Sequence, residues 1–316
     1  MKVYITRELP QIAETLLKKN GIKVSVFKKD SPVPKNTLIK NISDAQGLIS
    51  LLSDKIDKDI IDAMPGCKVI ANYAVGYNNI DFVYAKSKGI IVTNTPDVLT
   101  ESTAEIAIAL TLACTRRLIE GQEMIKQNGF KGWGPKLLLG LELNEKYFGI
   151  IGAGRIGTAA AIRAKAFGTK ILYCSNHKND YLESVTGAKK VSLNKLLSLS
   201  DVISLHLPLT PASYHLLNKQ NLKLLKSSAV LINTARGEIV DEKELIRMLK
   251  SNKIFAAGFD VYENEPLINP DLLKLNNVVL LPHVGSGTIE ARNKMAALAA
   301  KNVMAVLSGK KAITPV

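Results

Sequence analysis

Three polar residues in the last third of the sequence could together bind an anion and transfer a proton. Arg236, Glu265 and His283 each follow, within a few residues, a short apolar run that is typical of a strand. A guanidinium binds a carboxylate through two hydrogen bonds, and an imidazole exchanges protons near neutral pH. A carboxylate beside that imidazole would orient it and favour its charged form. The set therefore fits hydride transfer to a 2-oxo acid, although each residue alone has a purely structural alternative.

A glycine-rich turn indicates where the hydride would come from. In GIIGAGRIGTAAA, which starts at Gly149, three glycines follow an apolar run and open an alanine-rich stretch. The first permits a tight turn, the second lets the backbone approach a pyrophosphate, and the third allows close packing of helix on strand. We therefore expect a dinucleotide at the amino end of the following helix. The residues expected to hold it are Gly152, Ala153, Gly154, Arg155, Ile156 and Gly157.

The stretch ILYCSNHKND (171–180) bears on the choice of cofactor. NAD-binding units carry an acidic residue about 20 residues beyond the glycine fingerprint, where it accepts a hydrogen bond from the ribose 2′-hydroxyl. Ser175 occupies that place, and Asn176, His177 and Lys178 follow it. Hydrogen-bond donors and a cation suit a 2′-phosphate better than a carboxylate would. NADP(H) is therefore favoured as the cofactor, with NAD(H) as the alternative.

The elements that must position these residues form two successive series of strands and helices. The alternation of β-rich apolar runs with amphipathic stretches predicts βαβ units and parallel sheets. Helical patterns are expected at 8–19, over one long stretch at 102–127, and at 289–307. Strands are expected at 2–6, 24–27, 47–50, 68–73, 89–94, 148–152, 170–174, 201–207, 229–234, 255–261 and 278–282.

These series predict an α/β fold of two domains. Residues 1–99, completed by 287–316, would bind the substrate, and residues 100–286 would form a Rossmann-type, doubly wound parallel sheet for the dinucleotide. Ligands of such folds bind at the carboxyl ends of strands and between domains. The active site is therefore expected in the cleft between the two domains.

The composition narrows the classes of function. The chain has 42 Lys and Arg against 28 Asp and Glu, but its lysines are scattered and aromatic residues make up only 5%. Because a nucleic-acid binder gathers its basic residues and interleaves aromatics, a lysine-rich surface that could also attract small anions is favoured. Cys67, Cys114 and Cys174 lie far apart, so reduced thiols and no metal site are expected. With no signal-peptide core and no membrane-length apolar run, a cytoplasmic protein without membrane contact is expected.

The motifs resemble the D-isomer-specific 2-hydroxyacid dehydrogenase family over essentially the whole chain. Three further stretches are similar to its glyoxylate/hydroxypyruvate reductase branch: LLSDKID (51–57), ANYAVGYNNID (71–81) and GWGPKLLLG (132–140). Gly287 departs from the alanine that the family more often has there. The family motifs are GIIGAGRIG (149–157), LHLPLT (205–210), NTARGEIVDE (233–242), AAGFDVYENEP (256–266) and LPHVGSGT (281–288).

The resemblance implies NAD(P)H-dependent reduction of small 2-oxo acids to D-2-hydroxy acids, and a smaller, flavodoxin-like substrate domain. Arg236 would bind the substrate carboxylate, His283 would be the acid/base, and Glu265 would orient it. Leu52, Val75 and Gly76 would contact substrate from the first domain. Further cofactor contacts are implied at Leu207, Pro208, Thr234, Ala235, Arg236, Asp260, His283 and Gly285, with Asp260 at the nicotinamide carboxamide.

Some residues and functions keep alternatives. Trp133 either reaches the substrate site of a neighbouring subunit, which implies a homodimer, or packs locally as a loop anchor. His206 is expected to be structural, and His215 has no expected catalytic role. Among substrates, glyoxylate and hydroxypyruvate are expected first and 2-ketogluconate or another 2-oxo acid second. A non-enzymatic binding protein like the C-terminal binding protein corepressors, which share the fold, is the alternative from another class.

Overall fold

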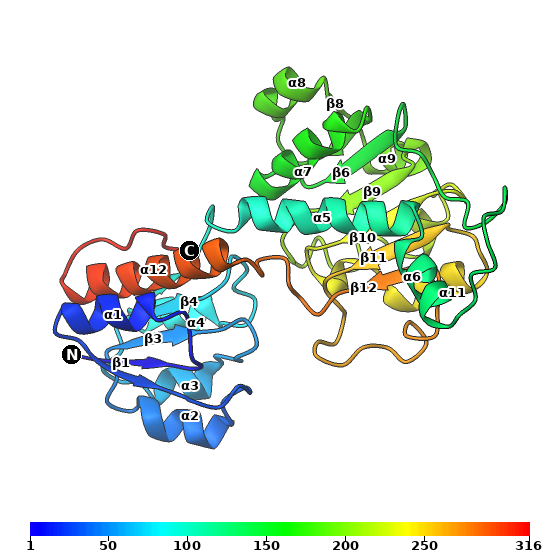
Figure 1. Ribbon diagram of the computed structural model, residues 1–316. Coiled ribbons are helices and arrows are strands. Elements are labelled where there is room, and N and C mark those ends of the chain that lie inside the picture. The colour runs from blue at the N-terminus through cyan, green and yellow to red at the C-terminus, as the bar shows by residue number, and fades with distance from the viewer. The chain divides into compact units, whose positions relative to one another are not determined.

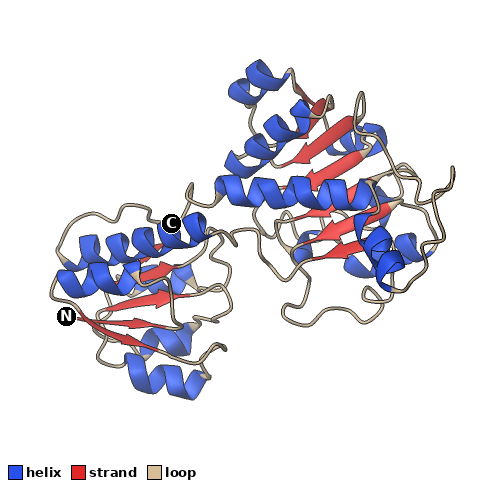
Figure 2. Cartoon of the chain, in the orientation of Figure 1, coloured by secondary structure: helices blue, strands red, loops and turns tan.

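The computed structural model describes all 316 residues and contains two compact units, each built on one sheet covered by helices (Figure 1, Figure 2). The first unit comprises residues 1–99 and 286–316, and the second comprises residues 100–285. All strand pairs in both sheets are parallel. The predicted α/β fold with two domains is therefore confirmed. In each sheet, the carboxyl ends of the strands face one edge.

The first unit contains β1 Lys2–Ile5, α1 Ile12–Lys19, β2 Lys23–Val26, α2 Lys35–Ile42, β3 Gly47–Ser50, α3 Lys58–Asp62, β4 Val69–Asn72, α4 Phe82–Ser87, β5 Ile91–Thr93 and α12 Ile289–Leu307. Its strand order, β2-β1-β3-β4-β5, is that of flavodoxin-like sheets. Every residue of β3 and β4 is buried, because helices cover both faces. Helices α1 and α12 lie on one face, and α2 and α3 lie on the other (Figure 1).

The second unit contains α5 Thr100–Thr115, α6 Leu118–Lys126, β6 Tyr147–Ile151, α7 Arg155–Ala166, β7 Lys170–Cys174, α8 Asp180–Thr186, β8 Lys189–Lys190, α9 Leu193–Leu199, β9 Val202–Leu205, α10 Lys219–Leu222, β10 Val230–Asn233, the 3-10 turn Gly237–Ile239, α11 Glu242–Lys250, β11 Ala256–Phe259 and β12 Val278–Leu280. Its strand order is β12-β11-β10-β9-β6-β7-β8. One apolar core joins α5 and α7 to the sheet, and a second joins α9, α10 and α11. The strand order reverses beside β6, which is where a Rossmann fold binds its dinucleotide.

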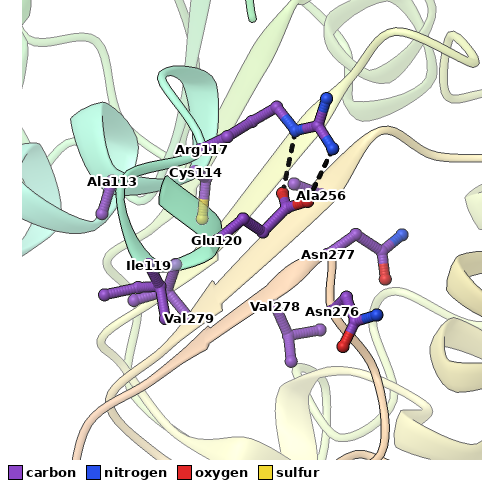
Figure 3. Close-up of a pocket in the computed structure, with 10 residues that line it drawn as sticks. All are labelled: Ala113, Cys114, Arg117, Ile119, Glu120, Ala256, Asn276, Asn277, Val278 and Val279. Atoms are coloured by element: carbon purple, nitrogen blue, oxygen red, sulfur yellow. Dashed lines mark hydrogen bonds and ion pairs between the residues drawn. The ribbon is translucent and has the colours of Figure 1, made fainter. Parts of the chain in front are cut away.

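The single helical stretch predicted at 102–127 is wrong, because the chain breaks between α5 and α6. Arg117 has a left-handed backbone (φ 51°), which a helix cannot continue. Its guanidinium donates two hydrogen bonds to Glu120, at 2.9 and 2.6 Å, and these fix the start of α6 (Figure 3). Helix α1 also begins later than predicted, at Ile12, after Pro10. Local features that the periodicity does not show, a left-handed residue and a proline, thus set these helix ends.

Candidate active site

Glu265 and His283 form a close pair in the second unit. The Oε2 atom of Glu265 lies 2.7 Å from Nδ1 of His283, and its Oε1 accepts a hydrogen bond from the Tyr262 N–H at 3.0 Å. Burial alone would raise the pKa of Glu265, but the hydrogen bond and charge of His283 outweigh it and hold that pKa below its ordinary range. The carboxylate therefore stays ionised. Because Nδ1 is engaged by Glu265, Nε2 is the ring nitrogen that remains for proton transfer.

Asp260 fixes the backbone from which His283 projects. Its two carboxylate oxygens accept hydrogen bonds from the N–H groups of Val284 and Gly285, each at 2.7 Å. His283 itself has a left-handed backbone (φ 55°), a conformation that costs a residue with a side chain about 1–3 kcal/mol. Burial raises the pKa of Asp260 despite these hydrogen bonds. The buried carboxylate therefore holds the loop after β12 in a conformation it would not adopt alone.

Arg236 lies in the loop after β10, beside the same pair. Asn233 shapes this loop, because its amide accepts from the Ala235 N–H at 3.0 Å and donates to the Arg236 carbonyl at 2.8 Å. The guanidinium donates to the Ala235 carbonyl at 2.6 Å, and no carboxylate lies within ion-pair distance of it. Burial lowers the pKa of Arg236, while the charges of Glu265 and Glu238 oppose that change. A partly buried cation without a close counter-ion is suited to bind an anionic ligand.

The glycine turn has the geometry that a dinucleotide requires. Gly152 has φ 96°, and a Cβ there would lie 2.4 Å from the His206 carbonyl oxygen. A Cβ at Gly157 would lie 2.1 Å from the Gly152 carbonyl oxygen, whereas one at Gly154 would meet no atom within 4 Å. The turn is thus tight at its first glycine, packed at its third and open at its second, where a pyrophosphate would approach. These features fit a nicotinamide dinucleotide on this loop.

The residues after the turn are held by a partner that sequence reasoning missed. Helix α7 begins at Arg155, so Arg155, Ile156 and Gly157 form its first turn. The Asn179 side chain donates to the Ala153 carbonyl at 2.8 Å and to Thr158 Oγ1 at 2.9 Å. Its Oδ1 also accepts from the Leu182 N–H and caps α8. The signal in the sequence was an ordinary helix cap, Asn before Asp-Tyr-Leu-Glu, which does not reveal the second contact.

The polar cluster Ser175–Lys178 lies where β7 ends, and its charge differs from the expectation. Lys178 forms ion pairs with Asp180 and Glu183, so its positive charge is largely balanced. Lys190 of β8, which sequence reasoning missed, reaches the same loop and donates to the Asn176 carbonyl at 3.1 Å. Ser175 is partly buried, while Asn176 and His177 are exposed. Lys190 thus joins the cluster, because β7 and β8 are neighbours.

The remaining cofactor residues lie at the carboxyl ends of β9 and β10. Leu207 and Pro208 follow His206, whose Nε2 lies 2.8 Å from Ser204 Oγ. Burial lowers the pKa of His206 to about 4, so its ring is neutral at neutral pH. Thr234 follows β10, and its Oγ1 is buried without a hydrogen-bond partner. A buried hydroxyl with no partner is unusual in a folded protein, and it fits a polar group of a bound cofactor.

Three expected substrate residues lie at the carboxyl edge of the first unit's sheet. Leu52 follows β3, and Val75 and Gly76 follow the neighbouring strand β4; all three are partly exposed. The Asn72 amide donates to the Gly76 carbonyl at 2.8 Å, and Asn79 donates to the Leu51 carbonyl at 3.0 Å. Asn72 and Asn79, which sequence reasoning missed, therefore hold the two loops. The substrate contacts of Leu52, Val75 and Gly76 stay a prediction.

Trp133 lies in the loop between α6 and β6 and is 86% exposed, so it does not pack locally within the chain.

A crevice of about 10 Å³ beside α6, β11 and β12 has room for one water molecule at most (Figure 3). A larger cavity of about 430 Å³ opens at the amino ends of β6 and β7, opposite the glycine turn, and none of the predicted site residues lines it. No group of His, Cys, Asp and Glu side chains is arranged to hold a metal ion. None of the helices has both the length and the apolar character needed to span a membrane.

Comparisons of this chain with known proteins point to one family of dehydrogenases. Residues 108–285 match the family model described as D-isomer specific 2-hydroxyacid dehydrogenase, NAD binding domain. A glyoxylate reductase from Thermococcus litoralis is 45% identical over 98% of this chain and 94% of its own length. A crystal structure of a protein from Thermus thermophilus has a TM-score of 0.94 and 42% identity, covering all of both chains. An NADPH-dependent glyoxylate/hydroxypyruvate reductase from Sinorhizobium meliloti, solved with NADP and malonate, has a TM-score of 0.87 and 32% identity, covering 100% of this chain and 96% of its own.

Proposed function

The chain belongs to the D-isomer-specific 2-hydroxyacid dehydrogenase family, in its glyoxylate reductase branch, and we propose that it reduces glyoxylate and hydroxypyruvate to D-2-hydroxy acids. It is an NAD(P)-dependent oxidoreductase. The observation that carries the proposal is Arg236, a guanidinium without a close carboxylate, next to the Glu265–His283 pair. A small 2-oxo acid has a carboxylate that Arg236 could bind and a carbonyl oxygen that His283 could protonate.

The proposed reaction divides the work among three side chains. Arg236 binds the substrate carboxylate and holds the adjacent carbonyl in place. His283 donates the proton on Nε2 to the carbonyl oxygen as the carbonyl carbon is reduced, so that the oxygen becomes a hydroxyl. Glu265 stays ionised and stabilises the positive charge that His283 carries before it gives up the proton. A nicotinamide held by the glycine turn would supply the hydride.

NADP(H) is the proposed cofactor, and NAD(H) is the alternative. Support comes from Ser175, which stands where NAD-binding units have a carboxylate, and from Lys190, which adds a cation to the same loop. The pairing of Lys178 with Asp180 and Glu183 works against a strong preference. The Sinorhizobium meliloti relative is described as NADPH-dependent. We therefore expect both cofactors to be used, with NADPH preferred.

A homodimer is proposed from the apolar arm, defined here as residues 118–139. Seven large apolar side chains of this arm are exposed, and helix α6 within it buries none of its residues. Such a concentration is typical of an interaction surface rather than of a solvated one. The exposed side chains are Leu118, Ile119, Ile125, Phe130, Trp133, Leu137 and Leu139. The reach of Trp133 into a partner's substrate site and the cytoplasmic location stay predictions.

A kinetic comparison tests the proposed function. Purified protein would be assayed for NADPH and NADH oxidation with glyoxylate, hydroxypyruvate and 2-ketogluconate. We expect kcat/KM to be highest for glyoxylate or hydroxypyruvate, and His283→Ala to lower kcat at least 100-fold while cofactor affinity stays within threefold. A best substrate of 2-ketogluconate would move the assignment to another 2-oxo acid. No turnover with any 2-oxo acid would contradict the proposal and favour the binding-protein alternative.

A further inference from the structure

His215 joins three loops of the second unit, although the sequence suggested no role for it. Its backbone N–H donates to the Glu238 carbonyl at 2.8 Å, in the loop directly after Arg236. Its ring Nε2 lies 3.0 Å from Oε1 of Glu263, and the Tyr214 ring stacks on it with centroids 4.2 Å apart. His215 also has a left-handed backbone (φ 45°). A strained residue whose ring meets a carboxylate from a distant loop invites a functional explanation.

Glu263 belongs to the Glu265 loop, defined here as residues 261–266. The N–H of Glu263 lies 3.4 Å from Oε2 of Glu242, and the neighbouring N–H of Tyr262 holds Glu265. Gly237 fits so closely under this loop that a Cβ there would lie 1.9 Å from the Tyr262 carbonyl carbon. Whatever fixes the Glu263 side chain therefore also fixes the adjacent peptide that donates to Glu265.

The charges around this loop make its position sensitive to His215. Glu242 and Glu263 are close enough to repel each other: burial and the charge of Glu263 raise the pKa of Glu242, although the hydrogen bond from the Glu263 N–H lowers it. Glu265 faces His283, Tyr262 and Arg236, and it also raises the pKa of Asp260. Without the hydrogen bond from His215, the Glu263 carboxylate would lose its partner and turn away from Glu242 toward water. The Glu265 loop would follow, since Glu263 and Glu265 share it.

We propose that His215 is a positioning residue for the Glu265–His283 pair, acting through Glu263 and the Glu265 loop. Its ring contacts Glu263 and Tyr214 rather than the proposed catalytic groups. The inference rests on the proposed function for its effect on turnover, but the strength of the Glu265–His283 pairing can be measured without any turnover.

Histidine NMR provides the measurement that is independent of activity. The chain has only four histidines, so the ring signals of His283 in protein labelled with isotope in its histidines can be assigned by substitution and titrated with pH. We expect His215→Leu to move the titration midpoint of His283 to lower pH by at least half a unit, because a displaced Glu265 stabilises the charged ring less. His215→Gln keeps a donor for Glu263 and should restore the wild-type midpoint. Lys226→Leu breaks an ion pair with Asp201 at the amino ends of β9 and β10, far from the Glu265 loop, and should leave the His283 midpoint unchanged.

Steady-state kinetics with glyoxylate and NADPH supply the second measurement. For His215→Leu we expect kcat to fall about tenfold and the high-pH decline of the rate to begin at lower pH, while the dissociation constant of NADPH and the thermal midpoint stay close to wild type. His215→Gln should recover most of the rate.

Three results would overturn the inference: an unchanged His283 midpoint in His215→Leu, equal shifts in His215→Leu and His215→Gln, or a lower kcat with an unchanged pH profile. A wild-type protein that reduces no 2-oxo acid would instead refute the proposed function, and the NMR titration would still decide the role of His215.

Discussion

The carboxylate of Asp260 accepts a hydrogen bond from the backbone N–H of Gly285 at 2.7 Å, although 25 residues separate the two in the sequence. The second oxygen of the same carboxylate accepts from Val284, also at 2.7 Å. Between them these bonds hold His283, the preceding residue, in a left-handed backbone conformation. The family resemblance implies a cofactor contact for Asp260. The structure adds a second task, which is to support the loop that carries the proposed acid/base.

Substitution of Asp260 by Asn should therefore impair catalysis through this loop. The amide nitrogen cannot accept a hydrogen bond, so either Val284 or Gly285 loses its buried partner, at a cost of about 1–3 kcal/mol. We expect kcat for glyoxylate reduction to fall about 10- to 100-fold. Asp271→Asn, at an exposed carboxylate paired with Lys250, serves as the control and should keep the wild-type rate. Equal rates in both variants would contradict the supporting role.

Removal of the Arg236 charge should weaken substrate binding far more than cofactor binding. Arg236→Gln keeps a polar side chain but loses the charged, two-pronged contact with a carboxylate, which is worth about 3 kcal/mol. We expect kcat/KM for glyoxylate to fall at least 100-fold, while NADPH titrated by fluorescence binds within threefold of wild type. Arg247→Gln removes a half-exposed arginine of α11 that pairs with Glu244, outside the proposed site, and should keep the wild-type kcat/KM. Normal glyoxylate reduction by Arg236→Gln would contradict the proposed contact between Arg236 and the substrate carboxylate.

A carboxylate at position 175 should change the cofactor preference. Ser175→Asp would repel a 2′-phosphate and accept a hydrogen bond from a 2′-hydroxyl. The ratio of kcat/KM with NADPH to that with NADH should therefore fall at least tenfold. Lys190→Ala, which removes the cation at the same loop, should lower the ratio in the same direction by a smaller factor. If neither variant lowered the ratio, the 2′-phosphate would lie elsewhere.

His206 should make the protein less stable in mild acid. Burial lowers the pKa of His206 from 6.5 to about 4, so between these values the unfolded chain binds a proton that the folded chain does not. Stability therefore falls as the pH drops through this window, by about 3 kcal/mol in all. Urea unfolding at pH 7 and pH 5 should show a smaller acid loss for His206→Gln than for wild type. His177→Gln, at an exposed histidine, should show the full loss, and the same loss in both variants would contradict the assignment.

The apolar arm should control the oligomeric state. Trp133 and Leu139 are 86% and 61% exposed, and burial of such side chains is worth about 1.5–3 kcal/mol each. We expect the wild type to sediment as a dimer and the double variant Trp133→Ser, Leu139→Ser to sediment as a monomer. Phe167→Ser, at an apolar side chain exposed on a different part of the second unit, should remain a dimer. A wild-type monomer would refute the proposed homodimer.

Local pattern was enough for most elements of the fold. Strand β7 and helix α12 have the bounds that the sequence predicted, because a run of apolar residues or a periodic stretch with a Thr288 cap leaves little choice. The stretch 102–127 failed because its periodicity continues across Arg117, where the pair with Glu120 and a left-handed backbone divide it. The charge on Lys178 was misread for a different reason, because its partners Asp180 and Glu183 approach it only when α8 forms.

By itself the sequence determined the α/β class, the spacing of Gly152, Gly154 and Gly157, and the presence of a guanidinium, a carboxylate and an imidazole after successive strands. These features depend on residue type and short-range order. The family resemblance also paired Glu265 with His283, but only the tertiary structure decided how the other carboxylate of that loop is placed. Glu263 and Glu265 stand two residues apart in one loop, yet the first lies against His215 and the second against His283. That division is made by Gly237 beneath the loop and Asp260 behind His283, contacts between distant segments that no local pattern encodes.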